Sequence, residues 1–279
     1  MKVSALLQQT ARRFIRAGLH YGHGTHSAKE EAAWLISSVL GYLLEEAVTI
    51  QAQKKVDTLV RRRIRERIPL AYLLKEAWLG EHSFYVDKRV IVPRSFIAEL
   101  LREHMSPWLA RDPKRALDLC TGSGCLAILM ALEFPKAQVD AADLSASALQ
   151  VAKINIKHYE MGKRVRAVRS DLFDSLGKKK YDLIVSNPPY VTASSMRKLP
   201  KEYRHEPSLA LAAGKDGLEL VHRILKDAKS HLAPGGLLVC EIGGNRRALE
   251  RAWPKLEFTW PETSEPGTVF ALGREQLPR

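Results

Sequence analysis

The sequence has few cysteines, no long apolar run and fewer acidic than basic residues. Its 279 residues include three cysteines, Cys120, Cys125 and Cys240, and none has the spacing of a zinc site or a disulfide framework. Each lies in an apolar run, so we expect reduced core thiols and no metal. No stretch approaches the roughly 18 apolar residues of a membrane helix, and no signal peptide is recognisable. We therefore expect a cytoplasmic protein without membrane contact.

The deficit of acidic residues leaves the chain strongly basic. It has 44 Lys and Arg against 31 Asp and Glu, a net charge of +13, and such a charge favours contact with polyanions and nucleoprotein surfaces. Residues 1–85 carry 13 basic and 8 acidic residues, so the excess is spread along the chain. The cluster Arg61–Arg63, with Arg65 and Arg67, is interpreted as a solvated helix face, and contact with nucleic acid is the alternative.

The first 82 residues have helical spacing. Leu6, Leu7, Phe14 and Ile15 predict one helix, a capping box at 27–30 opens a second that ends near 41, and an amphipathic stretch over 56–68 predicts a third. No nucleophile, acid pair or ligand set gathers here. We expect a small N-terminal helical domain over 1–82 that recognises the substrate, followed over 83–112 by a hairpin (strands 83–87 and 90–92) and a linker helix.

From residue 113 onward, strands alternate with helices. The expected strands are 116–120, 138–142, 165–170, 181–186, 237–241 and a closing antiparallel pair, 258–260 with 268–272. Strands separated by helices of 10–15 residues form βαβ units. The pattern predicts an α/β domain over 113–279 with a doubly wound, mostly parallel seven-stranded sheet.

Three acidic segments follow the first three of these strands in order. Asp118 opens Asp118-Leu119-Cys120-Thr121-Gly122-Ser123-Gly124, where glycines let backbone amides approach a ligand closely. Asp143 ends the second strand, where a carboxylate can accept both hydroxyls of a ribose. Asp171 and Leu172 end the third, where they could face an adenine. Parallel strands end at one edge of a sheet, so the three segments predict a nucleoside site.

The fourth strand ends in Asn187-Pro188-Pro189-Tyr190. Two prolines stiffen this loop and remove two donors. The Asn187 side-chain oxygen and the Pro188 carbonyl can both accept from one NH₂ group, and the Tyr190 ring offers a flat surface to an amide or a base. An amide nitrogen is a poor nucleophile because its lone pair is delocalised. The loop therefore predicts catalysis by orientation and local dipoles rather than by a strong base.

With these motifs the chain resembles the class I methyltransferases, and among them the glutamine N5-methyltransferases of translation proteins. The resemblance covers nearly the whole chain and implies S-adenosyl-L-methionine as cofactor and Asn187, Pro188, Pro189 and Tyr190 as the residues that grip the substrate glutamine. Cys120 stands where the family usually has Gly. The implied cofactor-binding residues are Asp118, Cys120, Thr121, Gly122, Ser123, Gly124, Asp143, Asp171, Leu172 and Asn187.

The segment after the expected hairpin separates two branches of this family. Val92-Pro93-Arg94-Ser95-Phe96-Ile97-Ala98-Glu99 is more similar to the branch that modifies the third protein of the large ribosomal subunit than to the release-factor branch. We therefore expect that ribosomal protein as the partner, with contact to ribosomal RNA or assembly intermediates. His205 is interpreted as a surface or loop-pinning residue. Arg94 and Glu206 either shape the substrate cleft or form a salt bridge.

Three other functions are left open by the sequence. The first is glutamine methylation of release factors. The second is methylation of adenine or guanine amino groups in nucleic acid, although the N-terminal segment has no evident base-reading motif and a duplex substrate would require base flipping. The third is a non-catalytic RNA-binding assembly factor, which would not need Asp143, Asp171 and the Asn-Pro-Pro-Tyr loop together.

Overall fold

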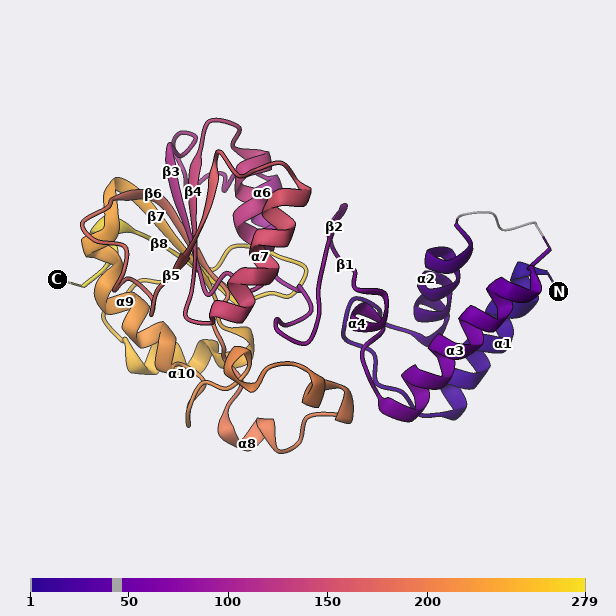
Figure 1. Cartoon of the computed structure of the whole chain (residues 1–279). Coiled ribbons are helices and arrows are strands. Elements are labelled where there is room, and N and C mark those ends of the chain that lie inside the picture. The colour runs from indigo at the N-terminus through magenta and orange to yellow at the C-terminus, as the bar shows by residue number, and fades with distance from the viewer. Residues whose placement is uncertain (1, 42–46, 279) are drawn as a thin grey trace.

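The computed structural model describes residues 2–41 and 47–278 and shows a helical N-terminal part, a small hairpin and a sheet flanked by helices (Figure 1). The N-terminus lies at the helical end and the C-terminus at the far side of the sheet. The N-terminal helices are α1 (Val3–Arg16), α2 (Ala28–Leu40), α3 (Ile50–Glu66) and α4 (Leu70–Leu74). None of the described helices combines the length and apolar character that crossing a membrane requires.

The expected helices form, with one boundary shifted. Ser27 caps α2 by accepting from the Glu30 backbone N–H at 3.2 Å, so the predicted N-cap is confirmed. The Glu30 carboxylate accepts from the His26 N–H instead of the Ser27 N–H, so the reciprocal bond of the predicted capping box does not form among the described residues. The third helix begins at Ile50, six residues before the predicted start, because the Thr49 hydroxyl caps it by accepting from the Ala52 N–H at 3.2 Å. The short α4 was not predicted.

The interpretation of the arginine cluster is wrong for Arg63. Its side chain is 1% exposed, and its guanidinium donates to Glu31 at 2.5 Å and to Glu202 at 3.4 Å. Arg67 also turns inward and donates to the carbonyls of Ala17 and Gly18. A buried cation needs compensating carboxylates, and one of them comes from a distant segment. Arg63 therefore joins the helical part to the segment around Glu202.

The predicted hairpin is displaced toward the N-terminus. It consists of β1 (Ala77–Leu79) and β2 (His82–Phe84), joined through Gly80 at φ +60°. Residues 90–92 are not a strand, because side chains occupy their backbone groups. The Val90 carbonyl accepts from the Tyr72 hydroxyl, and the Val92 N–H donates to Glu206 at 2.9 Å.

The sheet confirms the predicted fold class. It has the order β5-β4-β3-β6-β7-β8, with β8 antiparallel to β7 and all other pairs parallel. The predicted strand at 258–260 is reduced to a bridge between Thr259 and Ala271, and Pro261 lies just beyond it. The strands are β3 (Arg115–Leu119), β4 (Gln138–Asp143), β5 (Val165–Arg169), β6 (Tyr181–Ser186), β7 (Leu232–Glu241) and β8 (Val269–Gly273).

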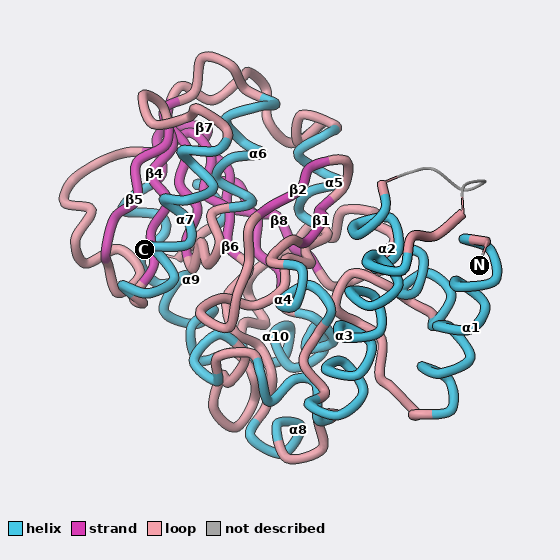
Figure 2. The backbone as a smooth tube through the Cα atoms, turned by 45° about the vertical axis from the view of Figure 1, so that its right-hand side comes forward, coloured by secondary structure: helices cyan, strands magenta, loops and turns pink. Residues whose placement is uncertain are grey.

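Alternate strand residues face two separate cores. Ala116 packs toward α5, α6 and α7, whereas Leu117 packs toward α9 and α10, as the two-residue period of a strand requires. Figure 2 shows the strands enclosed between these helices. The helices of this part are α5 (Ile97–Arg102), α6 (Cys125–Glu133), α7 (Ala146–His158), α8 (Ala193–Met196), α9 (Glu219–His231) and α10 (Arg246–Ala252); short 3₁₀ turns are η1 (Lys201–His205), η2 (Ser208–Ala210), η3 (Gly243–Asn245) and η4 (Arg274–Gln276).

The strand order opens a crevice beside β3. The chain runs outward from β3 to β4 and β5, then returns to β6 on the other side of β3. Loops that leave neighbouring strands in opposite directions leave a gap at the carboxyl ends, where ligands bind in sheets of this type. The loops after β3 and β6 carry the two strongest motifs of the sequence.

The burial of Arg63 can be tested by mutation. We expect Arg63→Ala to lower the free energy of unfolding by about 3–5 kcal/mol, because Glu31 and Glu202 lose a buried counter-charge. The matched control is Arg62→Ala, whose exposed pair with Glu66 is worth about 0.5 kcal/mol at most. Urea denaturation measures both. Equal effects of the two substitutions would contradict the buried cluster.

Candidate functional site

The loop after β3 is shaped by residues at positive φ and by close packing. Cys120, Gly122 and Gly124 have φ of +59°, +55° and +80°. A Cβ on Gly124 would lie 3.1 Å from the Cβ of Ala152 in α7 and 3.3 Å from its Cα, so glycine allows the loop to approach that helix. The Asn155 amide donates to the Ser123 carbonyl at 2.8 Å and fixes the same contact.

Asp118 lies behind this loop and not in the crevice. Its side chain is 1% exposed, and one carboxyl oxygen accepts from the Thr121 hydroxyl at 2.5 Å and from the Ala127 N–H at 3.1 Å. The other oxygen is buried without a hydrogen-bond partner among the described residues. Burial raises the pKa of Asp118 to about 7, although the two hydrogen bonds lower it. Asp118 thus joins β3, its loop and the start of α6.

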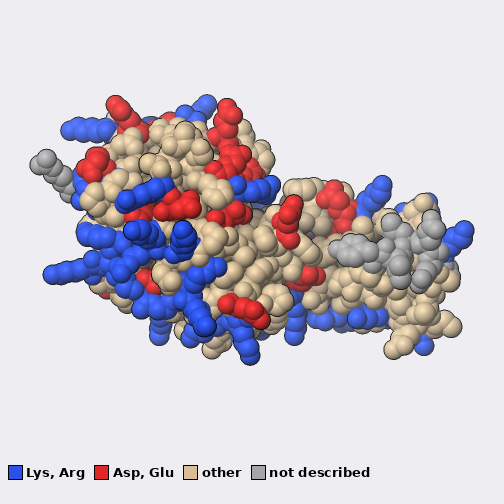
Figure 3. All heavy atoms as spheres, turned by 90° about the horizontal axis from the view of Figure 1, so that it is seen from above, with Lys and Arg blue, Asp and Glu red and all other residues tan. Residues whose placement is uncertain are grey.

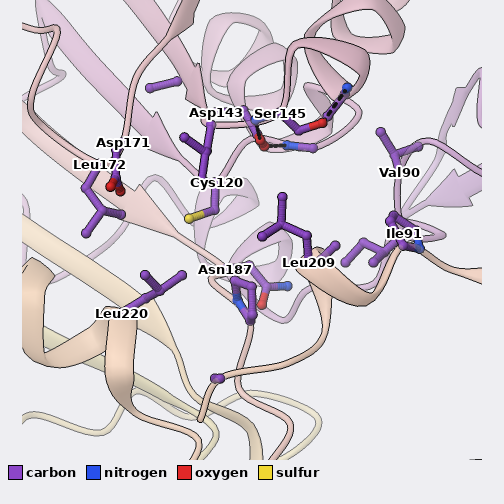
Figure 4. Close-up of a pocket in the computed structure, with 18 of the residues that line it drawn as sticks. Val90, Ile91, Cys120, Asp143, Ser145, Asp171, Leu172, Asn187, Leu209 and Leu220 are labelled. Carbon is purple, nitrogen blue, oxygen red and sulfur yellow. Dashed lines mark hydrogen bonds between the residues drawn. The ribbon is translucent and has the colours of Figure 1, made fainter. Parts of the chain in front are cut away.

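Asp143 faces the crevice from the end of β4. Its carboxylate accepts from the Gly122 N–H at 2.9 Å and the Ser145 N–H at 2.8 Å (Figure 4). Burial raises the pKa of Asp143, and these two backbone donors act against the rise. Each carboxylate oxygen keeps a further lone pair, so the group can still accept hydrogen bonds from a ligand's hydroxyls.

Asp171 and Leu172 form another wall of the crevice. Leu172 has φ +48° and is buried, and Asp171 pairs with Arg223 of α9 at 3.0 Å. In Figure 4 these residues lie across the crevice from Ile91, with Cys120 between them. The wall therefore combines an apolar surface with one carboxylate that has an accepting oxygen left.

The Asn187 amide is oriented by the segment that precedes α5. Its Nδ2 donates to the Arg94 carbonyl at 3.0 Å, which leaves Oδ1 as the group able to accept from a ligand. Pro188 has no N–H, so the loop beside Oδ1 is rich in acceptors. Asn187 can therefore hold an N–H group and cannot easily turn to present its own.

Tyr190 is fixed by two glycines and a carboxyl group. A Cβ on Gly243 would lie 2.8 Å from the Tyr190 ring, and one on Gly217 would lie 2.5 Å from the Tyr190 carbonyl, so both positions require glycine. The Tyr190 hydroxyl donates to Glu241 at 3.4 Å. Burial raises the pKa of Glu241 to about 7 despite donors from Ser95. The ring thus presents one face to the crevice.

Two cavities meet at the Asn-Pro-Pro-Tyr loop. One of about 330 Å³ lies between the loops after β3, β4 and β5, and one of about 190 Å³ lies between Arg94, Tyr190, Leu199 and Tyr203. Asn187 and Pro189 line both. A ligand in the larger cavity and a side chain in the smaller one would therefore come together at Asn187.

The structure brings most of the sequence-predicted residues to these cavities. Cys120, Gly122, Asp143, Asp171, Leu172, Asn187 and Pro189 line the larger cavity, and Asn187, Pro188, Pro189 and Tyr190 line the smaller one. Asp118, Thr121, Ser123 and Gly124 line neither and support the loop from behind. Sequence reasoning missed the apolar lining and two cations: Val90, Ile91, Leu144, Leu209, Leu220, Arg89 and Arg223.

Some of the missed residues could have been predicted from the sequence and others could not. Leu144 follows Asp143 directly and is 47% exposed, so its place next to the acid was a usable signal. Leu209 is 57% exposed and comes from the segment 207–210, which has no chemical motif. An exposed leucine has meaning only once the cavity beside it is known.

A network around Glu206 connects the smaller cavity to the helical part. Glu206 is buried and accepts two hydrogen bonds from Arg94, at 2.7 and 2.8 Å, and one from the Val92 N–H. His23 lies 3.7 Å away, and its ring is 4.4 Å from that of Tyr203. Burial raises the pKa of Glu206, but the nearby His23 and the hydrogen bonds and charge of Arg94 outweigh it and lower the pKa to about 2. Arg94 and Glu206 therefore form a salt bridge at the cavity wall.

His205 pins the same segment to the end of α3. Its Nε2 lies 2.9 Å from the Glu66 carbonyl, which confirms the loop-pinning interpretation. Glu202, one turn earlier, binds the His20 N–H and the guanidinium groups of Arg63 and Arg67. The segment 202–206 is thus where the helical part contacts the loop that follows Asn187.

Comparisons with known proteins identify the family of the chain. A family model described as "Methyltransferase small domain" matches residues 96–201. The chain is 52% identical to the ribosomal protein uL3 glutamine methyltransferase of Neisseria meningitidis serogroup A, over 98% of this chain and 93% of the relative. It is 48% identical to the enzyme of the same name from Bordetella pertussis, over 98% of this chain and 95% of the relative.

Solved structures support the fold. The crystal structure of the hMettl16 catalytic domain aligns with a TM-score of 0.56 at 16% identity, over 86% of this chain and 91% of that chain. A methyltransferase from Pyrococcus furiosus aligns with a TM-score of 0.50 at 18% identity, over 70% of this chain and 90% of that chain. At these low identities the similarity shows only the shared fold of the sheet and its flanking helices.

The raised pKa of Asp118 predicts a pH dependence of stability. In the folded chain the carboxyl is protonated below about pH 7, whereas in the unfolded chain it ionises near its ordinary pKa of 3.8. Between these values the unfolded state binds fewer protons, so Asp118 lowers stability as pH rises, by at most about 1.4 kcal/mol per pH unit. We expect Asp118→Asn to gain stability relative to wild type between pH 4.5 and 7.5. Urea denaturation at both pH values measures this, and parallel pH profiles would contradict it.

Proposed function

The chain belongs to the family of ribosomal protein uL3 glutamine methyltransferases, and we propose that it transfers a methyl group from S-adenosyl-L-methionine to the side-chain amide nitrogen of a glutamine in uL3. The observation that carries the chemistry is the position of Asn187. It lies where the two cavities meet, with its amide orientation fixed by the Arg94 carbonyl.

The larger cavity fits the cofactor. Its volume of about 330 Å³, the buried carboxylate of Asp143 and the apolar side chains of Leu144, Leu172 and Leu209 suit a nucleoside with a short polar chain. We assign Asp143 to the ribose hydroxyls and the remaining oxygen of Asp171 to the adenine amino group. Cys120 and Gly122 border the methionine part. Asp118, Thr121, Ser123 and Gly124 support that loop.

The chain's own residues act by orientation. When bound, S-adenosyl-L-methionine supplies a methyl group on a positively charged sulfur. Asn187 Oδ1 and the Pro188 carbonyl accept from the two N–H groups of the glutamine amide, which turns the nitrogen lone pair toward that methyl group. The same two dipoles stabilise the positive charge that develops on nitrogen. The sulfur would keep the electron pair of the broken carbon–sulfur bond as a neutral thioether, and the methylated nitrogen, which is then strongly acidic, would release one of its protons to water, so no strong base is needed. Tyr190 and Pro189 confine the planar amide.

We propose that residues 1–82 select the protein substrate, that 83–112 link the domains and that 113–279 carry the catalysis. The smaller cavity is bordered by Leu199 and Tyr203, and Tyr203 packs against His23 of the helical part. A loop of uL3 that inserts its glutamine would pass beside these helices. We also propose that the enzyme acts in the cytoplasm, where ribosomal proteins are synthesised, and that it contacts ribosomal RNA or assembly intermediates.

The assignment of Asp143 predicts a loss of cofactor affinity. Asp143→Ala should weaken binding of S-adenosyl-L-methionine by about 1.5–3 kcal/mol, the range for hydrogen bonds to a charged group. Asp140→Asn is a matched control in the same strand, because Asp140 pairs with Arg166 and Lys179 outside the cavity. Isothermal titration calorimetry measures both. Wild-type affinity in folded Asp143→Ala would remove Asp143 from the site.

The role of Asn187 predicts that its substitution affects the rate of methyl transfer but not the affinity for the cofactor. Asn187→Ala should keep cofactor affinity while transfer falls by about two or more orders of magnitude, the effect of losing one oriented dipole of about 2.7–4 kcal/mol. Asn187→Asp should also be slow. It loses the N–H that binds the Arg94 carbonyl, and its negative charge stabilises the cationic donor more than the transition state.

The substrate is tested with methyl-labelled cofactor. We expect one methyl group on a single glutamine of uL3 by mass spectrometry, and none on release factors or nucleic acid bases, with Asn187→Ala as the inactive control. Label in release factors or bases, with uL3 untouched, would overturn the substrate assignment. Cofactor binding without transfer to any of them would support a non-catalytic assembly factor instead.

A further inference from the structure

A large share of the chain's charge gathers far from the methyl-transfer site. Residues 153–180 contain nine Lys or Arg and three Asp or Glu, so one tenth of the chain carries a net charge of +6 out of +13. Figure 3 shows Lys and Arg side chains gathered on one side of the sheet domain, whereas mixed charges lie near the junction with the helical part. The basic excess is therefore denser in residues 153–180 than a comparison of residues 1–85 with the rest of the chain suggests.

These residues surround a hollow surface. One hollow of about 770 Å³ lies between α7 and β5, and another of about 390 Å³ lies at the starts of β3, β4, β5 and β6. Lys163 and Arg166 line both, so the two form one continuous depression. We call it the basic groove and define it by Arg115, Lys153, Lys157, Lys163, Arg166 and Lys179.

Four of these six cations, Arg115 and the three lysines Lys153, Lys157 and Lys163, have no compensating partner among the described residues. Asp140 binds Arg166 at 2.8 Å and Lys179 at 2.9 Å, and these pairs are internal to the sheet edge. Lys153, Lys157 and Lys163 are exposed and form no salt bridge or side-chain hydrogen bond with any residue in the described ranges. Lys153 and Lys157 are one helical turn apart, so both extend from one face of α7, about 6 Å from each other.

Protection of a sheet edge explains only part of this charge. Strand β5 pairs with β4 alone among the described strands, and charged residues on an edge strand prevent unwanted pairing. That accounts for Arg166 and Arg169. It does not account for Lys153 and Lys157, which lie on a helix, or for Lys163, which lies in a loop. The lysines therefore point to an external polyanion.

The lining favours a phosphate backbone over bases and membranes. Among the described residues that line the groove, the one aromatic side chain is Tyr181, whose hydroxyl is bound to Asp140. Single-stranded nucleic acid is held largely by stacking on aromatic rings, and these are missing here. A lipid surface is flat and cannot fill a depression, whereas a rod-like duplex can.

We propose that the basic groove binds the sugar–phosphate backbone of duplex RNA without reading its sequence. This inference rests on the proposed function, because it means that the enzyme meets uL3 on RNA. The second hollow adjoins the starts of β3, β4 and β6, whereas the cofactor cavity adjoins their ends. RNA contact and methyl transfer therefore use opposite ends of the sheet and can proceed together.

The test compares two charge-reversed variants of the full chain. The first is Lys153→Glu/Lys157→Glu/Lys163→Glu. The matched control is Lys54→Glu/Lys55→Glu/Arg61→Glu, three exposed cations of α3 with the same change in net charge. Fluorescence anisotropy measures binding to a labelled 20-base-pair RNA duplex at several salt concentrations, and thermal unfolding verifies that both variants fold.

We expect wild type and the control to bind the duplex similarly, and the groove variant to bind at least about tenfold more weakly. In a plot of log affinity against log salt concentration, the slope for the groove variant should be smaller in magnitude by about 2–3, because each lost phosphate contact contributes about 0.9 to the slope. Equal losses in both variants would overturn the proposal, as would tighter binding of the single strand or of anionic phosphatidylserine vesicles by wild type.

Methyl transfer to free uL3 separates this inference from the proposed function. The groove variant should methylate free uL3 at the wild-type rate and should be slower than wild type on uL3 bound to RNA. If duplex binding depends on the three lysines but no methyl group is transferred to uL3, the RNA-binding role of the groove would hold and the substrate assignment would be wrong. Equal rates of wild type and groove variant on RNA-bound uL3 would overturn the role of the groove.

Discussion

The geometry of the smaller cavity depends on the buried carboxylate of Glu206. It fixes the guanidinium of Arg94 and the Val92 N–H, and the carbonyl of Arg94 in turn orients the Asn187 amide. His23 approaches the same carboxylate from the helical part. One charged group therefore connects the linker, the Asn-Pro-Pro-Tyr loop and the N-terminal helical part. A shift of any of these three would change the direction of the Asn187 side-chain dipole.

Burial alone does not decide the charge of the acids around the crevice. Asp118, Glu206 and Glu241 are all nearly inaccessible, yet the pKa is about 7 for two of them and about 2 for Glu206. The difference is that Glu206 has a bidentate guanidinium, whereas Asp118 has only neutral donors. Of these three acids, Glu206 therefore keeps its negative charge at neutral pH, whereas Asp118 and Glu241 titrate near neutrality.

The two ends of the sheet have different physical character. The carboxyl ends of the strands combine glycine loops and apolar side chains with charged residues of both signs. The opposite end and the β5 edge are open and strongly basic. Under our proposal that the protein substrate sits on RNA, this separation would let electrostatic attraction bring the assembly in without placing phosphates beside the reacting nitrogen.

The sequence by itself determined the features that depend on neighbours along the chain. The Ser27 N-cap of α2, the strand–helix alternation, the acids near strand ends and the Asn-Pro-Pro-Tyr loop are local patterns. Parallel strands place their ends together whatever the details of packing. These patterns were enough to predict the fold class and part of the cavity lining, but not its apolar residues such as Ile91 and Leu209. The displaced hairpin was not predicted, because side chains from Tyr72 and Glu206 occupy the backbone groups of the segment that reads as a strand.

Only the tertiary structure decided which charged residues are internal. Arg63 and Arg62 are neighbours with the same local pattern, but Arg63 alone faces Glu31 and Glu202 and is buried. Asp118 and Asp143 both end strands, but the loop after β3 closes over the first and leaves the second facing the cavity. Burial and the pairing of distant charges depend on which surfaces meet when the chain folds, and no periodicity along the sequence contains that information.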